Sequence, residues 1–254
     1  MLRPLADEFR AARRDRTLVV VEGFHALKHA LRFGAEVRRV VASASAPLDQ
    51  LVAQLAPDLE VALPVVERVD DGEFARLVPR VPRTGVVALA GRPVVNVTAV
   101  LGGVLSAPVV LLENPRTMGN VGAVVRVAAA AGAAAVLTTG PHDPWQADAV
   151  RGAAGLQFAL PVAPIETALI DDATRPLIAL DPDGDELTGA VGLPAGAILA
   201  FGTERDGLTD ALLARADRRV RLPMRPGVSS LNLATSVAAA LYAWRLVGQQ
   251  GSAR

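Results

Sequence analysis

Short, uninterrupted apolar runs place the strongest constraint on how the second half of this 254-residue chain can fold. Four such runs, each of four or five residues, occupy positions 109–112, 134–138, 177–180 and 197–201, and they are apolar throughout except for Thr138 at the end of the second. Runs that are apolar at every position are typical of parallel strands covered on both faces. Helical spacing is expected between them and after them, at about 121–131, 165–171, 208–214 and 230–247. The pattern predicts an α/β domain built on a parallel sheet.

The first part of the chain predicts a smaller α/β module. An arginine-rich helical stretch precedes three predicted strands at 17–21, 37–42 and 85–90, with predicted helices at 23–33 and 48–55. Residues 92–107 contain Pro93, Gly102 and Gly103 and show weak periodicity. We therefore expect an N-terminal domain over 1–91, a linker over 92–107 and a second domain over 108–254.

Several protein classes are disfavoured by composition. The longest apolar run, 127–137, has 11 residues and is interrupted by Gly132, whereas a spanning helix needs about 20. The charged first sixteen residues have no apolar core, so no signal peptide is expected. The absence of cysteine excludes disulfides and thiolate metal sites, and a cytoplasmic protein is expected. His25 and His29 have the spacing of two metal ligands but no third ligand nearby, so no metal site is expected. Because no apolar run is long enough to span a membrane, no membrane partner is expected.

The formal charges balance, with 26 Lys and Arg against 26 Asp and Glu. Taken alone, this argues against nucleic acid as a partner, because nucleic-acid binders usually carry a basic excess. The balance is an average, however, and residues 1–39 hold nine cations against five acids. The balanced total therefore does not exclude a local basic face that binds nucleic acid.

Two residues near the first predicted strand end are candidates for chemistry. Ligands in open α/β sheets bind beyond the carboxyl ends of strands, and the loop after 109–112 leads through Asn120 into a helix that carries Arg126. Both can face one pocket if the helix begins near Asn120. Arg126 stands in an apolar stretch and is expected to be buried, so it needs an anion or an acidic partner. A bound anionic ligand and a structural salt bridge are equally open from this residue alone.

Two further loops carry polar residues at strand ends. The loop around Gly202, Thr203 and Glu204 follows the strand at 197–201, although an ordinary turn explains its pattern equally well. The loop 222–232 enters the last helix, where Ser229 or Ser230 is a predicted N-cap. Asn232 lies in the expected first turn and needs hydrogen-bond partners if it is buried.

In this order, the three loops resemble the three motifs of the SpoU (TrmH) family of RNA ribose 2′-O-methyltransferases in the SPOUT superfamily. The matching stretches are NPRTMGNVGAVVRVAAAAGA, ILAFGTERDGL and LPMRPGVSSLNLATSVAAA, within about residues 108–247. Between them, AVRGAAGLQFALPV resembles the family's Arg-x-Ser-x-Gly segment, with Ala153 where serine is usual. Each motif is weak alone, whereas three in order at family spacing are highly specific. The first module is similar to the substrate-binding domain that often precedes this catalytic domain.

The resemblance implies a SPOUT-type sheet with a deep trefoil knot, a homodimer formed through the C-terminal domain, and S-adenosylmethionine as cofactor, with S-adenosylhomocysteine as product. By motif position it implies a set of catalytic residues, namely Asn120, Arg126, Glu204, Ser230 and Asn232. It also implies a set of cofactor-binding residues, namely Gly202, Thr203, Glu204, Leu222, Met224, Ser230, Leu231 and Asn232.

The resemblance therefore favours methyl transfer to a ribose 2′-hydroxyl of RNA, with ribosomal RNA favoured over transfer RNA. A guanidinium stays protonated in proteins, so we expect Arg126 to act as an electrostatic stabiliser, while a role as the base stays open. The alternative is a knotted RNA-binding or ribosome-assembly protein without catalysis. The expected RNA contacts are Arg13, Arg14, Arg38, Arg39 and Arg126.

Overall fold

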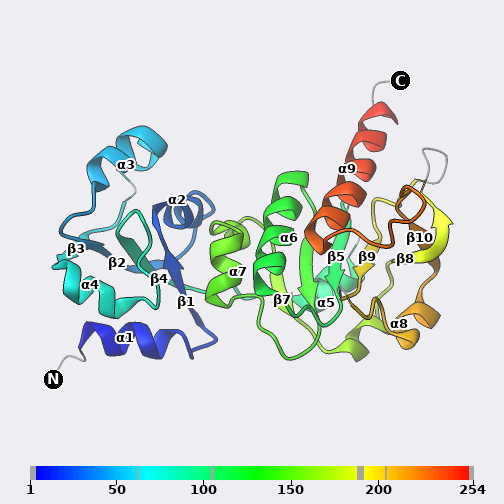
Figure 1. Cartoon of the computed structure of the whole chain (residues 1–254), viewed down its shortest axis with the longest axis horizontal. Helices are drawn as coiled ribbons and strands as arrows, with labels where there is room; N and C mark the ends of the chain where they lie inside the picture. Colours follow the sequence, from blue (N-terminus) through cyan, green and yellow to red (C-terminus); the bar gives the residue numbers. More distant parts are fainter. Residues whose placement is uncertain (1–3, 62, 104–105, 188–191, 204, 252–254) are drawn as a thin grey trace. The chain divides into compact units, whose positions relative to one another are not determined.

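The computed structural model describes residues 4–61, 63–103, 106–187, 192–203 and 205–251, and the chain divides into two compact units (Figure 1). Unit 1 comprises Met1–Val94 and Trp145–Ala159, and unit 2 comprises Val95–Pro144 and Leu160–Arg254. The chain therefore passes between the units three times. The segment 145–159 belongs to unit 1 although its flanking residues belong to unit 2.

Unit 1 contains a four-stranded sheet in the order β1-β4-β2-β3. β4 pairs antiparallel with β1 and β2, and β2 pairs parallel with β3. A core that includes Phe9, Val20, Phe74, Leu77 and Val87 joins two of its helices to the sheet. The elements of this unit are α1 (Leu5–Ala12), β1 (Leu18–Glu22), α2 (Phe24–Arg32), β2 (Val37–Ser43), α3 (Leu48–Leu55), η1 (Pro57–Leu59), β3 (Val66–Val69), α4 (Asp71–Leu77), β4 (Val86–Gly91), α7 (Ala147–Gly152) and η2 (Leu156–Phe158).

Unit 2 contains a six-stranded sheet in the order β10-β8-β9-β5-β6-β7, in which every neighbouring pair is parallel. All residues of β5, β6 and β9 are buried, which confirms the predicted α/β fold with a covered parallel sheet. Among the described residues, no helix is long and apolar enough to cross a membrane. The elements of this unit are α5 (Val97–Gly102), β5 (Val109–Leu112), α6 (Met118–Ala131), β6 (Ala135–Thr138), β7 (Val162–Pro164), η3 (Thr167–Ile170), β8 (Leu177–Glu186), β9 (Ile198–Phe201), α8 (Asp210–Arg215), β10 (Arg218–Arg221) and α9 (Leu233–Gly251).

Three strands were not predicted, and all three lie at sheet edges. β3 is the edge of the sheet in unit 1, and β7 and β10 are the two edges of the sheet in unit 2. β3 reads VERV and β10 reads RRVR, so neither has the apolar run that identifies a central strand. An edge strand pairs on one side only and tolerates charged side chains.

Three predicted segments differ in their structure. The stretch 92–107, expected as a linker, contains α5, whose Val100 and Leu101 are buried in the core of unit 2. The helix expected at 165–171 is the short 3-10 helix η3. α9 begins at Leu233 rather than at Ser230, because the side-chain oxygen of Asn232 accepts a hydrogen bond from the Ala234 amide at 2.9 Å and caps the helix.

A buried carboxylate holds the segment 145–159 in unit 1. The Glu22 side chain is 3% exposed and receives the Arg151 guanidinium at 2.7 Å and that of Arg13 at 3.2 Å. The hydrogen bond to Glu22 raises the pKa of Arg151. Gly155, at φ +78°, lies so close to the backbone of Ala26 that no Cβ would fit. These contacts fasten the segment to β1 and α2.

Replacement of Arg151 tests this attachment. Arg151→Ala leaves the buried Glu22 carboxylate with Arg13 alone, and we expect the free energy of unfolding to fall by about 2 kcal/mol. Urea denaturation measures it. Asp148→Ala is the control, because Asp148 is the exposed partner of Arg151 and its loss is expected to cost less than about 0.5 kcal/mol. Equal effects of the two variants would contradict a structural role for the buried pair.

Candidate active site

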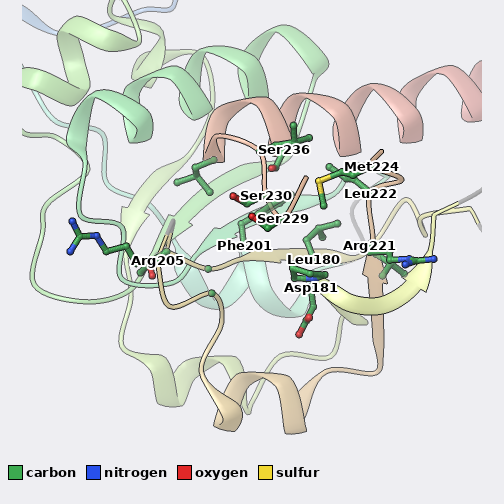
Figure 2. Close-up of a pocket in the computed structure, with 17 residues that line it drawn as sticks. Leu180, Asp181, Phe201, Arg205, Arg221, Leu222, Met224, Ser229, Ser230 and Ser236 are labelled. Carbon is green, nitrogen blue, oxygen red and sulfur yellow. The ribbon is translucent and has the colours of Figure 1, made fainter. Parts of the chain in front are cut away.

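A cavity lies at the carboxyl edge of the sheet in unit 2. The strands β5, β6 and β7 extend the sheet in one direction, and β9, β8 and β10 extend it in the other. The carboxyl ends of parallel strands at such a change of direction form the usual ligand crevice of open α/β sheets. Residues in the middle of β8, at the ends of β9 and β10, in the loops after β9 and β10, and in α9 line a cavity of about 350 Å³ (Figure 2).

The loop after β9 brings backbone to the cavity. Thr203 and Gly207 exchange two backbone hydrogen bonds, at 3.0 and 3.1 Å, and close a short loop between them. Gly207 has φ +67°, a conformation that L side chains rarely adopt. A Cβ on Gly202 would overlap the backbone of Gly207, so only glycine fits at position 202. Gly202, Thr203 and Gly207 of this tight loop line the cavity, so the loop brings its backbone close to any bound ligand.

The loop after β10 supplies both apolar and hydroxyl groups. Leu222 and Met224 line the cavity together with Ser229, Ser230 and Ser236. In Figure 2, Ser229 and Ser230 lie below Ser236 on α9, and Met224 and Leu222 lie beside them. Part of the cavity lining is therefore apolar, and three serine hydroxyl groups lie next to that part.

Two of the charged side chains that line the cavity, Asp181 and Arg221, have partners at its margin. Asp181, at the end of the buried part of β8, accepts from the Arg219 guanidinium at 2.8 Å and from the Asp183 amide at 2.8 Å. The Arg221 guanidinium donates to Glu186 at 3.0 Å. These contacts neutralise two of the charges around the cavity and leave its apolar wall as the dominant surface.

Two contacts tie the loop after β5 to the loop after β9. The Glu113 carboxylate, on a residue that is 6% exposed, accepts from the Thr209 amide and from the Thr209 hydroxyl, each at 2.7 Å. The Arg116 guanidinium pairs with Asp206 at 3.1 Å on the surface. The first two predicted loops therefore meet at the same end of the sheet.

The third loop meets the first through two amides. The side-chain nitrogen of Asn232 donates to the side-chain oxygen of Asn120 at 3.3 Å. Asn120 lies in the first turn of α6, and Asn232 directly precedes α9, which packs against α6. Residues 112 positions apart in the chain are thus held together beside the cavity.

The cavity gathers most of the predicted cofactor positions. Those that line it are Gly202, Thr203, Leu222, Met224, Ser230 and Leu231. Asn120, Arg126 and Asn232 do not line it, and Glu204 lies outside the described residues. Among the described residues, no cluster of three histidine, aspartate or glutamate side chains could hold a metal ion.

The expectation that Arg126 is buried is wrong. Its side chain is exposed and makes no hydrogen bond or ion pair with the part of the chain that the structure describes. α6 buries Val121, Val124, Val125 and Ala128, while Gly119, Arg126 and Ala130 of the same helix are exposed. An apolar neighbourhood in the sequence therefore did not imply burial here, because neighbouring residues on a helix point in different directions and Arg126 lies on the outward face.

The sequence interpretation missed Leu180, Asp181, Phe201 and Ser236, all of which line the cavity. The strand-end rule that selected the other loops applies equally to the end of the apolar run at 177–180, and it would have found the first two. Ser236 had no comparable signal, since its position depends on where α9 begins and how the helix packs.

Three of the arginines predicted to contact RNA are in ion pairs. Arg13 pairs with Glu22, Arg38 pairs with Glu36 at 3.2 Å, and Arg39 pairs with Glu67 at 2.9 Å and Glu8 at 3.5 Å. Arg14 is exposed without a partner in the described ranges. A role of these residues in RNA binding stays a prediction.

Comparison with known proteins gives consistent matches over both halves of the chain. The model of the SpoU rRNA Methylase family matches residues 107–242. An uncharacterized tRNA/rRNA methyltransferase of Mycobacterium tuberculosis is 34% identical over 81% of this chain and 76% of its own length. A 23S rRNA (adenosine(1067)-2′-O)-methyltransferase of Streptomyces azureus is 28% identical over 94% of this chain and 90% of its own length. The crystal structure of the SpoU methyltransferase AviRb from Streptomyces viridochromogenes, in complex with the cofactor AdoMet, shares the fold, with a TM-score of 0.80, 24% identity and full coverage of both chains.

The glycine at position 202 provides a test of the loop geometry. Gly202→Ala places a Cβ against the Gly207 backbone, and we expect the free energy of unfolding to fall by about 2 kcal/mol. Gly102→Ala in α5 is the matched control, because nothing lies within 4 Å of its Cβ position, and a change within about 0.5 kcal/mol is expected. Urea denaturation compares the two, and a Gly202 variant as stable as its control would contradict the close approach of the two glycines.

Proposed function

The chain belongs to the SpoU rRNA Methylase family of RNA methyltransferases, and we propose that it transfers the methyl group of S-adenosylmethionine to a ribose 2′-hydroxyl of RNA. The observation that carries the proposal is the cavity beyond β8, β9 and β10, which gathers six of the positions that the family motifs assign to the cofactor. A relative that is named as a 23S rRNA 2′-O-methyltransferase covers 94% of the chain and supports the same reaction.

The residues around the cavity fit this cofactor. A volume of about 350 Å³ falls in the range of roughly 300–1,000 Å³ that small-molecule sites occupy. The apolar wall of Leu222 and Met224 suits a planar adenine, and the absence of a side chain at Gly202 lets the ligand approach the backbone of the loop. The hydroxyls of Ser229, Ser230 and Ser236 suit the ribose and the amino-acid portion. When bound, S-adenosylmethionine supplies a methyl group on a positively charged sulfur.

The exposed guanidinium of Arg126 is available to the RNA. It makes no hydrogen bond or ion pair with described residues that would neutralise its positive charge. We assign it the stabilisation of the negative charge that develops on the ribose oxygen, or of an adjacent phosphate. The amides of Asn120 and Asn232, which can donate and accept at once, orient the ribose. Glu204 keeps the catalytic and cofactor-binding role that its motif position implies.

A homodimer through unit 2 is part of the proposal. α9 leaves Tyr242, Leu246 and Val247 exposed, at 43%, 59% and 46%. Large apolar side chains grouped on one helix are typical of an interaction surface. We propose that this surface binds a second copy of the chain.

We also propose for this protein the three further properties expected from the sequence, namely a deep trefoil knot, a preference for ribosomal RNA and a cytoplasmic location.

Removal of the Arg126 guanidinium separates binding from catalysis. Arg126→Ala is expected to bind S-adenosylmethionine as the parent protein does, and to transfer methyl groups to RNA about 100-fold more slowly, because charge stabilisation at the ribose oxygen is lost. Calorimetry measures cofactor binding, and transfer of tritiated methyl groups measures turnover. Arg10→Ala, which removes an exposed arginine paired with Asp7, is the control. Unchanged turnover of Arg126→Ala would contradict the assigned role.

A bulky side chain at position 236 tests the cavity as the cofactor site. Ser236→Phe fills the cavity from α9, and we expect the affinity for S-adenosylmethionine to fall at least about tenfold. Thr235→Phe is the matched control, since Thr235 is the exposed neighbour on the same helix and does not line the cavity. Calorimetry that finds no binding by the parent protein would favour an RNA-binding protein without catalysis.

A further inference from the structure

Ion pairs neutralise many of the arginines of unit 1, including three of the predicted RNA contacts described above. Arg32 adds another pair, since its guanidinium donates to the Asp58 carboxylate at 2.6 and 2.8 Å. A phosphate that approached these arginines would compete with a carboxylate already in place. The cations without such partners are therefore the better candidates for contact with a polyanion.

Cations without such partners lie on α2 and in the loop that precedes β4. On this helix His25 is exposed and Lys28 is half-buried, while Phe24, Ala26, Leu27 and Ala30 are buried. The loop 79–84 adds Arg80 and Arg83, which are both exposed. His25, Lys28, Arg80 and Arg83 make no hydrogen bond or ion pair within the described part of the chain.

The loop is fastened to the first turn of α2. The Phe24 amide donates to the Thr84 hydroxyl at 2.9 Å. A Cβ on Gly23, at φ +92°, would lie 3.6 Å from the Cβ of Pro82. These contacts bring the start of α2 and the loop together, although they are about 60 residues apart in the chain. We use the name α2–loop surface for the exposed and half-buried residues of these two segments, namely His25, Lys28, Arg80, Val81 and Arg83.

The loop is also held in one conformation. Pro79 and Pro82 restrict its backbone, and the Gly85 amide closes a turn on the Pro82 carbonyl at 2.9 Å. Gly85 itself, at φ +61°, has the β-carbon of Ala46 so close that an added Cβ would lie 2.9 Å from it. A loop that is already ordered loses little entropy when it binds a partner.

The charge of the α2–loop surface has one sign. Neither α2 nor residues 78–85 contain an acidic residue, so Lys28, Arg80 and Arg83 contribute three formal positive charges. The pKa of Asp58 is lowered chiefly by the hydrogen bond from Arg32, which already binds this carboxylate, and to a smaller extent by the charge of Lys28. Val81 stands between the two arginines and is 51% exposed, which adds an apolar contact to the cationic ones.

We propose that the α2–loop surface binds the phosphate backbone of the RNA substrate and that Arg80 and Arg83 are its principal contacts. An arginine presents a planar fork of donors that matches phosphate oxygens. An RNA fits better than a protein partner, because a rigid cluster of cations around a single small apolar side chain complements a polyanion. This inference rests on the proposed function and assigns RNA binding in unit 1 to a surface distinct from Arg13, Arg38 and Arg39.

RNA binding by the full-length double variant R80A/R83A tests the proposal. The probe is an unmodified 23S rRNA transcript, with bulk transfer RNA in parallel, and filter binding is measured over a series of salt concentrations. We expect the affinity of the double variant to fall at least about tenfold and the slope of log K against log salt to decrease by about one for each arginine. The KM for RNA is expected to rise while kcat and the affinity for S-adenosylmethionine stay unchanged.

Arg10→Ala is the matched control, because it removes an exposed arginine of the same unit that pairs with Asp7 at 2.7 Å. A double variant with the parent affinity and salt slope on both RNAs would overturn the proposal, and so would a parent protein that binds neither RNA. If the parent protein binds RNA without methylating it, and the double variant loses that binding, the proposed function fails while the RNA surface stands.

Discussion

The buried carboxylate of Glu113 joins the end of β5 to the N-terminus of α8, and the loops around the cavity depend on this link. Its two hydrogen bonds from Thr209 satisfy a charge that would otherwise be costly to bury. Thr209 in turn accepts a hydrogen bond from the Leu212 amide and caps α8. The tight loop at Gly202 and Gly207 lies between β9 and this cap, so its path is fixed at both ends.

Much of the fold could be predicted, because a parallel sheet covered on both faces requires apolar residues at every position of its central strands. That rule identified β5, β6 and β9 and the start of β8, and the order of the loops led to the cavity. The same rule did not identify edge strands such as β10, because an edge strand is paired on one side only and can carry charged residues. The environment of Arg126 could not be predicted either, since alanines are compatible with both faces of a helix.

The zero net charge of this chain partly reflects arginines that are paired with acidic residues inside the fold. In unit 1 many arginines form ion pairs with acidic residues of the same unit. The Glu22 carboxylate pairs with two of them, Arg13 and Arg151. Such pairs hold the fold together and leave only part of the positive charge for a partner. The balance of 26 cations against 26 acids therefore coexists with a local cationic surface at α2. Sequence counts cannot separate paired from unpaired arginines, because pairing depends on which strands and helices meet.

The position of the transferred methyl group tests the central claim most directly. The purified protein is incubated with RNA and S-adenosylmethionine labelled on its methyl group, and the RNA is then hydrolysed in alkali. Alkaline cleavage uses the ribose 2′-hydroxyl as nucleophile, so a methyl group on that oxygen blocks it. The account predicts that the label is recovered in alkali-resistant dinucleotides. Recovery of the label in mononucleotides methylated on the base, or no transfer to any RNA, would contradict it.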